Sequence, residues 1–204
     1  VISVGTDRTE SALRDCLALG VDEAYLLTDD AFEGSDPQAL ARILSAGLKK
    51  LGDFDLVLAG KQAVDSDSAQ VPGAVAALLD APQAMFVKKF DSVDGGKAVV
   101  HRQTEDGFDV VELTLPAVVS VVKEINEPRL PSLKGKMAAK KKTITKWSAA
   151  DIGVEVSAVG ANSGTKTVKV TPPPPRPKGE KIEGETPEEL ADKLFEKLRE
   201  KQII

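Results

Sequence analysis

The sequence has few of the residue types that form disulfides, metal sites or catalytic triads. Its 204 residues include one cysteine, Cys16, one histidine, His101, and one tryptophan, Trp147. A single cysteine cannot form an intramolecular disulfide, and a lone histidine lacks the companions that a zinc site or a triad requires. We therefore expect no catalytic residue and no metal site. Cys16 is expected to be a buried small hydrophobe, His101 to have a surface or cross-strand role, and Trp147 to be a half-buried anchor.

Long apolar runs and an excess of positive charge are missing as well. No apolar run approaches the ~20 residues of a membrane-spanning helix. The net charge of −5 argues against general binding to nucleic acids or membranes. A hydrophobic content of 42% with 29% charged residues is typical of a globular protein. The length is sufficient for one α/β domain with an appendage, and the single cysteine favours a reducing compartment.

Short apolar strands alternate with helical patterns before Pro82. Strands are expected at residues 1–4, 24–27 and 56–59, and helices at residues 10–19, 37–48 and 72–79. Uniformly apolar strands in this alternation predict a parallel sheet that helices cover on both faces. The chain starts directly on an apolar strand that needs hydrogen-bond partners, so we expect missing sequence upstream.

The pattern changes after Pro82. Residues 84–90, 97–102 and 108–115 are expected to form strands joined by glycine-containing turns, followed by one more apolar strand at residues 117–122. These strands predict an antiparallel extension of the parallel sheet. Residues 126–142 contain prolines, Gly135 and many cations, and are expected to form a long surface loop that enters a short helix near Met137. An α/β domain would span residues 1–170 and include this loop.

Residues 171–204 are expected to form a C-terminal arm. A four-proline run at residues 172–175 separates it from the α/β domain. Pro187 follows the cap candidate Thr186 and starts a helix. Its apolar stripe consists of Leu190, Leu194, Phe195 and Leu198. An amphipathic helix beyond a proline linker has little of its own to pack on, so it is expected to dock on this domain or on a partner.

Residues 60–71 connect an apolar strand to a helix and are the best candidate for a ligand site. Ligands of open α/β sheets bind at that edge, and a helix N-terminus there favours a phosphate. Ser66, Ser68 and backbone amides could donate to phosphate oxygens, while Asp65 could accept from a ribose hydroxyl. The alternative is a solvated loop whose Asp and Ser residues merely cap the helix. Neither Gly-x-Gly-x-x-Gly nor a P-loop is present.

Several stretches, in order along nearly the whole chain, resemble the β subunits of electron-transfer flavoproteins. They are Leu17-Ala18-Leu19-Gly20-Val21-Asp22, Gly60-Lys61-Gln62-Ala63 with Asp65, Asp67 and Gln70, Asn126-Glu127-Pro128-Arg129 with residues 131–135 and 138–142, and residues 173–179 before the last helix. The second is similar to the family's adenine-nucleotide loop. The third is similar to the segment with which the family grips partner dehydrogenases.

The resemblance implies a role for particular residues. The nucleotide would be bound by Val4, Gly60, Lys61, Gln62, Ala63, Val64, Asp65, Ser66, Asp67, Ser68, Ala69, Gln70 and Val71. Partner recognition would involve Arg129, Leu130, Pro131, Ser132, Leu133, Lys134, Gly135, Lys136, Met137 and Ala138. Arg102 would reach the FAD of the α subunit, where a guanidinium raises the electron affinity of the flavin. The basic segment has no aromatic residue to stack a base, so its lysines suit an acidic protein better than RNA or lipid.

Departures from the family pattern leave the bound nucleotide open. Ser68-Ala69-Gln70-Val71 stands where the AMP-binding branch has Asn-Gln-Thr-Gly, and Gln70-Val71 is similar to the electron-bifurcating branch, in which a second FAD replaces AMP. Gln103 replaces a family glutamate, which removes any inter-subunit ion pair there. The family's first strand and helix, with further nucleotide and flavin contacts, are also lacking.

The implied function is that of the non-catalytic half of a heterodimer. Electrons would pass from dehydrogenases of the acyl-CoA type, as in fatty acid oxidation, through the FAD held mainly by the α subunit to a quinone reductase. The alternatives are a bifurcating subunit that carries its own FAD and oxidises NADH, or a standalone nucleotide-binding regulatory module. The location would be the bacterial cytoplasm or, in a eukaryote, the mitochondrial matrix.

Overall fold

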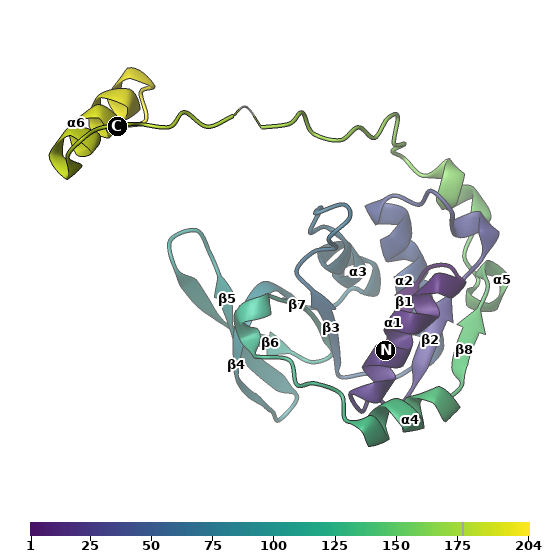
Figure 1. Cartoon of the computed structure of the whole chain (residues 1–204). Coiled ribbons are helices and arrows are strands. Elements are labelled where there is room, and N and C mark those ends of the chain that lie inside the picture. Colours follow the sequence, from purple (N-terminus) through teal and green to yellow (C-terminus); the bar gives the residue numbers. More distant parts are fainter. Residues whose placement is uncertain (177) are drawn as a thin grey trace. The chain divides into compact units, whose positions relative to one another are not determined.

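The computed structural model describes residues 1–176 and 178–204, which divide into two compact units, Val1–Lys166 and Thr167–Ile204. The first unit contains all the strands of the described chain and is of the α/β class, as predicted (Figure 1). Short 3₁₀ helices connect its elements at Asp7–Thr9, Asp30–Phe32, Lys123–Ile125, Val156–Ala158 and Gly160–Asn162. No helix among the described residues is both long enough and apolar enough to cross a membrane.

A three-stranded parallel sheet forms one side of the first unit. Its strands are β1 (Ile2–Val4), β2 (Ala24–Leu27) and β8 (Ile144–Trp147), in the order β1-β2-β8. Successive residues of β2 point to opposite faces: Leu26 packs with α1 (Glu10–Ala18) and Leu27 with α2 (Pro37–Leu51). Helices therefore cover both faces of this sheet, as its apolar strands predict.

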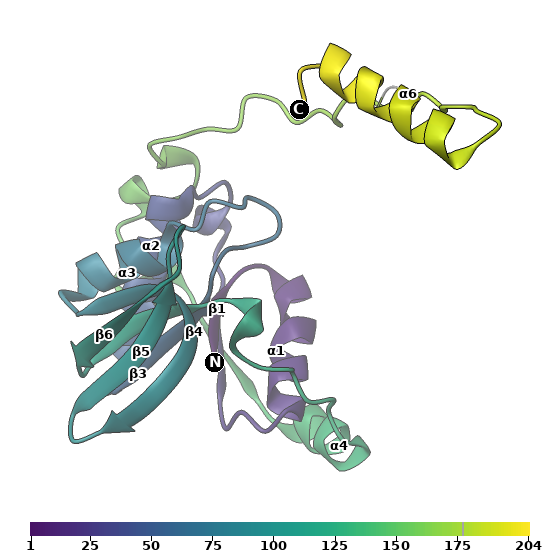
Figure 2. The ribbon, with the colours of Figure 1, turned by 90° about the vertical axis from the view of Figure 1, so that its left-hand side faces the viewer.

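A second, five-stranded sheet lies beside the first. Its strands are β3 (Leu56–Gly60), β7 (Ala117–Val121), β4 (Gln83–Asp94), β5 (Lys97–Gln103) and β6 (Phe108–Thr114), in the order β3-β7-β4-β5-β6 (Figures 1 and 2). The β3–β7 and β7–β4 pairs are parallel, and the β4–β5 and β5–β6 pairs are antiparallel. The antiparallel extension is thus confirmed. The parallel strands, however, belong to two sheets rather than one.

Helix α2 holds the two sheets together. One part of it packs on Leu27 with Ile43, and another packs Ala41 and Leu48 against α3 (Val71–Leu79) and Val118 of β7. Gly47 allows a close approach, because a Cβ there would lie 2.8 Å from side-chain atoms of Ile2 and Leu27. Strand β3 is covered less fully than predicted, since Leu58 is 60% exposed.

The second unit contains helix α6 (Pro187–Glu200). It begins as the sequence predicts, with Thr186 as N-cap accepting a hydrogen bond from the backbone N–H of Glu189 at 3.2 Å. Within this unit the apolar stripe is incompletely covered: Leu190, Leu194 and Phe195 are exposed. An uncovered apolar stripe on an amphipathic helix is the geometry that the prediction of a docking arm requires.

Two capping carboxylates join distant segments of the first unit. Asp29 accepts from the backbone N–H groups of Ala31 and Ala149, each at 3.0 Å, and so ties β2 to α5 (Ala149–Ile152). Asp36 is the N-cap of α2 and accepts from the N–H of Ala39 at 2.8 Å and of Thr165 at 3.0 Å. These donors lower the pKa of both carboxyl groups, chiefly through Ala31 for Asp29 and through Ala39 for Asp36.

Folding stability is therefore expected to depend on pH in the acid range. A carboxyl group with a lower pKa in the folded chain stabilises the fold above its unfolded pKa of about 3.9, and this stabilisation is lost as the pH falls through the folded value. Asp36→Ala should lower the free energy of unfolding by about 1 kcal/mol at pH 7 and weaken its decline below about pH 4. Urea titrations at several pH values would measure this, with exposed Asp30→Ala as the control. An unchanged acid dependence in Asp36→Ala would contradict the role of the cap.

Candidate functional site

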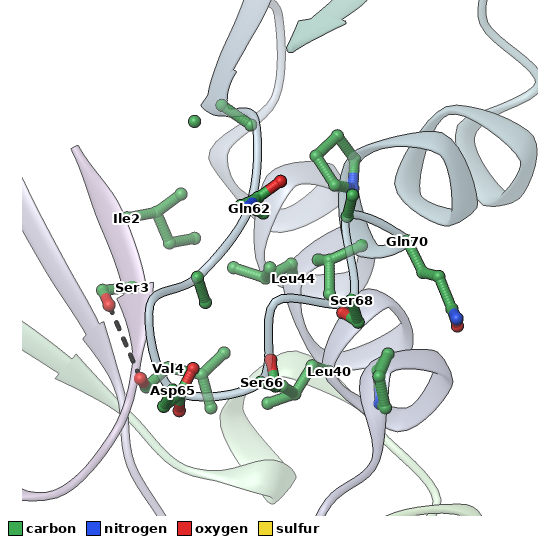
Figure 3. Close-up of a pocket in the computed structure, with 17 residues that line it drawn as sticks. Ile2, Ser3, Val4, Leu40, Leu44, Gln62, Asp65, Ser66, Ser68 and Gln70 are labelled. Carbon is green, nitrogen blue, oxygen red and sulfur yellow. Dashed lines mark hydrogen bonds between the residues drawn. The ribbon is translucent and has the colours of Figure 1, made fainter. Parts of the chain in front are cut away.

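A cavity of about 440 Å³ lies where the carboxyl ends of β1 and β3 meet the amino ends of α2 and α3 (Figure 3). We call it the loop cavity, because residues 61–70 close one side of it. Its lining comprises Ile2, Ser3, Val4, Pro37, Leu40, Leu44, Ala59, Gly60, Gln62, Ala63, Asp65, Ser66, Ser68, Ala69, Gln70, Val71 and Pro72. The volume falls within the range of about 300–1,000 Å³ that is usual for small-molecule sites.

The walls of the loop cavity combine an apolar floor with a polar rim. Ile2, Val4, Leu40 and Leu44 contribute aliphatic side chains, and the loop contributes carboxylate, hydroxyl and amide groups (Figure 3). Such a division suits a ligand with one flat apolar part and one part rich in hydroxyl or phosphate oxygens. An adenine nucleotide has both parts, so the residues that are present fit it.

The amino end of α3 is left free for a ligand. Gln70 is its N-cap residue but makes no side-chain capping hydrogen bond. Helix α1 lacks such a bond as well, whereas α2, α4 (Leu133–Lys141), α5 and α6 each have one. Among the described residues, neither Asp65 nor Ser68 makes a side-chain hydrogen bond to the start of α3, so these side chains do not cap it. Uncapped N–H groups at the positive end of a helix dipole favour phosphate oxygens.

The loop is braced in an unusual backbone conformation. Asp67 and Ala69 have φ values of 52° and 53°, in the left-handed region that non-glycine residues rarely adopt. The Gln62 side chain donates to the Asp67 carboxylate, and the Asp67 N–H donates to the Ala63 carbonyl at 2.9 Å. Such strained positions concentrate at ligand-binding segments, where the surrounding structure enforces them.

Most of the predicted nucleotide residues line the loop cavity, and three do not. Lys61, Val64 and Asp67 lie outside it, and the Val64 side chain is fully exposed. The sequence did not single out Ile2, Ser3, Pro37, Leu40, Leu44, Ala59 and Pro72. The rule that ligands bind at the carboxyl edge of parallel strands points to Val4 at the end of β1, and Ser3 directly precedes it.

A second cavity of about 460 Å³, here called the arginine cavity, contains Arg102. It is lined by Lys61, Phe86, Arg102, Gln103, Thr104 and Glu105. The Lys61 Nζ lies 5.4 Å from the centre of the Phe86 ring. The Arg102 Nε is buried without a hydrogen-bond partner among the described residues, 3.6 Å from an oxygen of Asp109. Two cations beside an aromatic ring suit an anionic, planar ligand.

Phe86 reaches this cavity through an irregularity in β4. Its φ of 63° is an outlier for a bulky residue, and it lies where the pairing of β4 with β7 shifts register between Ala84 and Val87. The buried hydroxyl of Ser120 accepts the Phe86 N–H at 2.9 Å. This bond satisfies a donor that the bulge removes from the strand ladder.

An open groove of about 1,070 Å³ adjoins both cavities. It shares Gly60 and Gln62 with the loop cavity, and Lys61 and Gln103 with the arginine cavity. Its other residues are Val64 and Val121, Val122, Lys123, Glu124, Ile125, Asn126, Glu127 and Pro128. The start of the loop is thus a wall common to all three spaces.

Residues 126–142 form a loop that enters a short helix around Met137, as predicted. The helix is α4, which begins at Leu133 and is capped by Ser132, whose hydroxyl accepts from the Gly135 N–H at 3.0 Å. Leu133 is 76% exposed and Met137 is 60% exposed, and residues four apart lie on the same face of a helix. Lys134, Lys136, Lys140 and Lys141 are exposed and form no ion pair among the described residues.

The single histidine, tryptophan and cysteine of the chain each lie against neighbouring elements of the first unit. His101 lies 2.6 Å from an oxygen of Asp91 on β4 and stacks on Phe108 of β6, which confirms its cross-strand role. Trp147 is half-buried beside Tyr25, as predicted. Cys16 is half-buried rather than buried, because it lies at the edge of the stripe that α1 turns toward β2. No cluster of three potential metal ligands occurs in the part of the chain that the structure describes.

The region that contains the cavities and α4 is similar to known proteins. Residues 1–152 match the family model of the electron transfer flavoprotein domain. The chain is 45% identical over 205 residues to the caffeyl-CoA reductase-Etf complex subunit CarD of Acetobacterium woodii, covering 100% of this chain and 78% of that protein. It is 40% identical over 206 residues to the electron transfer flavoprotein subunit beta of Thermoanaerobacterium thermosaccharolyticum, with the same coverage of 100% and 78%. The corresponding subunit of Mycobacterium leprae is 43% identical over 186 residues, which cover 91% of this chain and 70% of the relative.

Proposed function

This chain belongs to the electron-transfer flavoprotein family as a β subunit, and we propose that it binds an adenine nucleotide in the loop cavity while an α subunit holds the redox FAD. Such subunits are components of electron carriers rather than enzymes. The α subunit's FAD, when bound, supplies the redox centre. The chain described here would contribute a wall of that site, the structural nucleotide and the docking surface for a dehydrogenase.

The observation that carries the nucleotide proposal is the uncapped α3 beside the loop cavity. Backbone N–H groups at the start of α3 would donate to the phosphate, and Ser66 and Ser68 would add hydroxyl donors. The Asp65 carboxylate is exposed at the rim and would accept from ribose hydroxyls. Leu40 and Leu44 of α2 would pack on the adenine ring.

A second FAD is the alternative occupant, and one observation favours it. The large groove shares Gly60 and Gln62 with the loop cavity, so the flavin part of a dinucleotide would extend past these two residues into the groove. One relative is named as a subunit of a caffeyl-CoA reductase-Etf complex. With FAD in this position, the protein would be an electron-bifurcating subunit that oxidises NADH.

Arg102 is proposed to lie against the flavin that the α subunit holds. Its guanidinium and the Lys61 ammonium line the same cavity, and positive charge beside a flavin favours the reduced, more negative form. The partner that donates electrons is proposed to be a dehydrogenase of the acyl-CoA type. The named relatives come from bacteria, which favours the bacterial cytoplasm as the location.

The α subunit is proposed to bind α6. Deleting residues 176–204 should abolish or strongly weaken co-purification with a flavin-bearing α subunit. The melting temperature of the remaining unit should change little, because the buried hydrophobic core of the described chain lies entirely at or before Val159. Leu194→Asp, within the exposed stripe, should act in the same direction as the deletion, and Lys201→Asp beyond the helix should act less. Unchanged heterodimer affinity in the deletion variant would contradict this role.

A further inference from the structure

We infer that Arg14 of α1 caps the carboxyl end of α4, that Arg129 and Lys142 tie α4 to the chain at and just beyond the end of α1, and that Arg14 and Lys142 are positioning residues for the docking surface of α4. The inference rests on the docking function proposed for α4. Figures 1 and 2 both show α4 against the end of α1. The contacts between these two helices, which are far apart in the sequence, determine how Leu133 and the exposed lysines are presented.

Arg14 of α1 caps the carboxyl end of α4. Its Nη1 donates to the carbonyl of Ala139 at 3.0 Å and to the carbonyl of Lys142 at 3.2 Å. The last carbonyls of a helix have no partner within that helix, and a cation at this end is favoured by the helix dipole. Arg14 thus supplies both a hydrogen-bond donor and a charge where α4 needs them.

Two cations that flank α4 bind carbonyls at the end of α1 and in the turn that follows it. The Lys142 Nζ donates to the carbonyls of Val21 at 2.8 Å and Asp22 at 2.9 Å, just beyond α1. Arg129, which precedes α4, donates to the carbonyl of Leu19, the C-cap residue of α1. Both ends of the recognition segment are therefore tied to the same helix end by charged donors.

Gly135 brings the two backbones into contact between these ties. A Cβ at this position would lie 2.4 Å from the Ala18 carbonyl oxygen, a distance that no side chain tolerates. Ala18 and Ala139 belong to the same buried cluster, which includes Leu13 and Leu17. Glycine is unfavourable inside a helix, and here its lack of a side chain is what lets α4 lie directly on α1.

The cations of residues 129–142 therefore form two groups, which differ in what they contact. Arg129 and Lys142 donate to backbone carbonyls of the same chain. Lys134, Lys136, Lys140 and Lys141 remain exposed around Leu133 and Met137. A surface that is already ordered before binding loses less conformational entropy when the partner docks.

The test uses the heterodimer and compares Arg14→Gln with Arg14→Lys. Arg14→Gln should raise the amide exchange rates of residues 133–141 at least tenfold and raise the KM for the dehydrogenase severalfold, with kcat unchanged. Arg14→Lys keeps the charge, so it should raise the amide exchange rates and the KM less than Arg14→Gln does. Gly135→Ala is a second variant that displaces α4 without changing charge, and it should raise the KM in the same way.

Lys141→Gln serves as the matched control for charge. It should leave the exchange rates of α4 unchanged and reduce the salt dependence of the reaction rate, whereas Arg14→Gln should leave that salt dependence unchanged. Unaltered exchange in Arg14→Gln, or faster exchange with an unaltered KM, would overturn the inference. Failure of the docking function itself would be visible separately, as a normal KM in Leu133→Ala while exchange in Arg14→Gln is still accelerated.

Discussion

Asp65→Asn is expected to weaken binding of the adenine nucleotide about 10- to 100-fold. A hydrogen bond to a charged group contributes about 1.5–3 kcal/mol, and each 1.4 kcal/mol is about tenfold in affinity. Asp65 lies on the rim of the loop cavity and caps no helix, so its carboxylate is available to ribose hydroxyls. Calorimetric titration of the nucleotide-free heterodimer with AMP and with FAD would measure the change for each candidate.

Asp55→Asn is the matched control for this prediction. Asp55 is an exposed residue just before β3, at the opposite edge of the sheet, and does not line the loop cavity. The Asp55→Asn substitution makes the same change in charge, but the variant should bind both nucleotides as the unmutated protein does. Equal affinities for Asp65→Asn and Asp55→Asn would show that the rim carboxylate takes no part in binding.

Leu133→Ala is expected to reduce kcat/KM for electron transfer from the dehydrogenase severalfold to about 100-fold. Truncating an apolar anchor that a partner buries costs about 1–3 kcal/mol. Leu133 begins α4 and is 76% exposed, so it does not fold back onto its own domain. The flavin spectrum and the melting temperature should therefore remain unchanged. Stopped-flow kinetics at constant ionic strength would measure the rate.

Val156→Ala provides a control for the loss of an exposed aliphatic group. Val156 is 50% exposed in a short 3₁₀ helix outside the recognition segment, and its carbonyl bond to Asn162 involves only its backbone. It should transfer electrons at the normal rate. A Leu133→Ala protein that melts earlier but transfers electrons normally would contradict the anchor role.

Much of the fold follows from local sequence patterns. The elements that these patterns do not predict were missed for identifiable physical reasons. Helix α2 and its cap at Asp36 are clear in the sequence because the cap, the proline and the apolar stripe agree. Strand β8 is not, because Thr145 and Lys146 are exposed on an edge strand that is only four residues long, so no apolar run marks it. Its pairing with β2 is a long-range contact.

The helix at residues 133–141 illustrates a second limit. The lysines and alanines favour a helix, whereas Gly135 and the prolines before it favour a loop. The close contact with Ala18 requires the glycine, and the capping by Arg14 stabilises the helix end. Both causes lie more than a hundred residues away in the chain, so no local pattern records them. The same holds for Leu40 and Leu44, whose spacing predicts only a core-facing helix although they also line the loop cavity.

The central claim is that this β subunit holds an adenine nucleotide in the loop cavity, and identifying what the purified heterodimer carries tests it most directly. Denaturing the complex and quantifying the released nucleotides by mass spectrometry should give one adenine nucleotide per β subunit in addition to the FAD of the α subunit. AMP would indicate the dehydrogenase-linked branch, and a second FAD the bifurcating branch. A heterodimer that releases a single FAD and no further nucleotide would contradict the account.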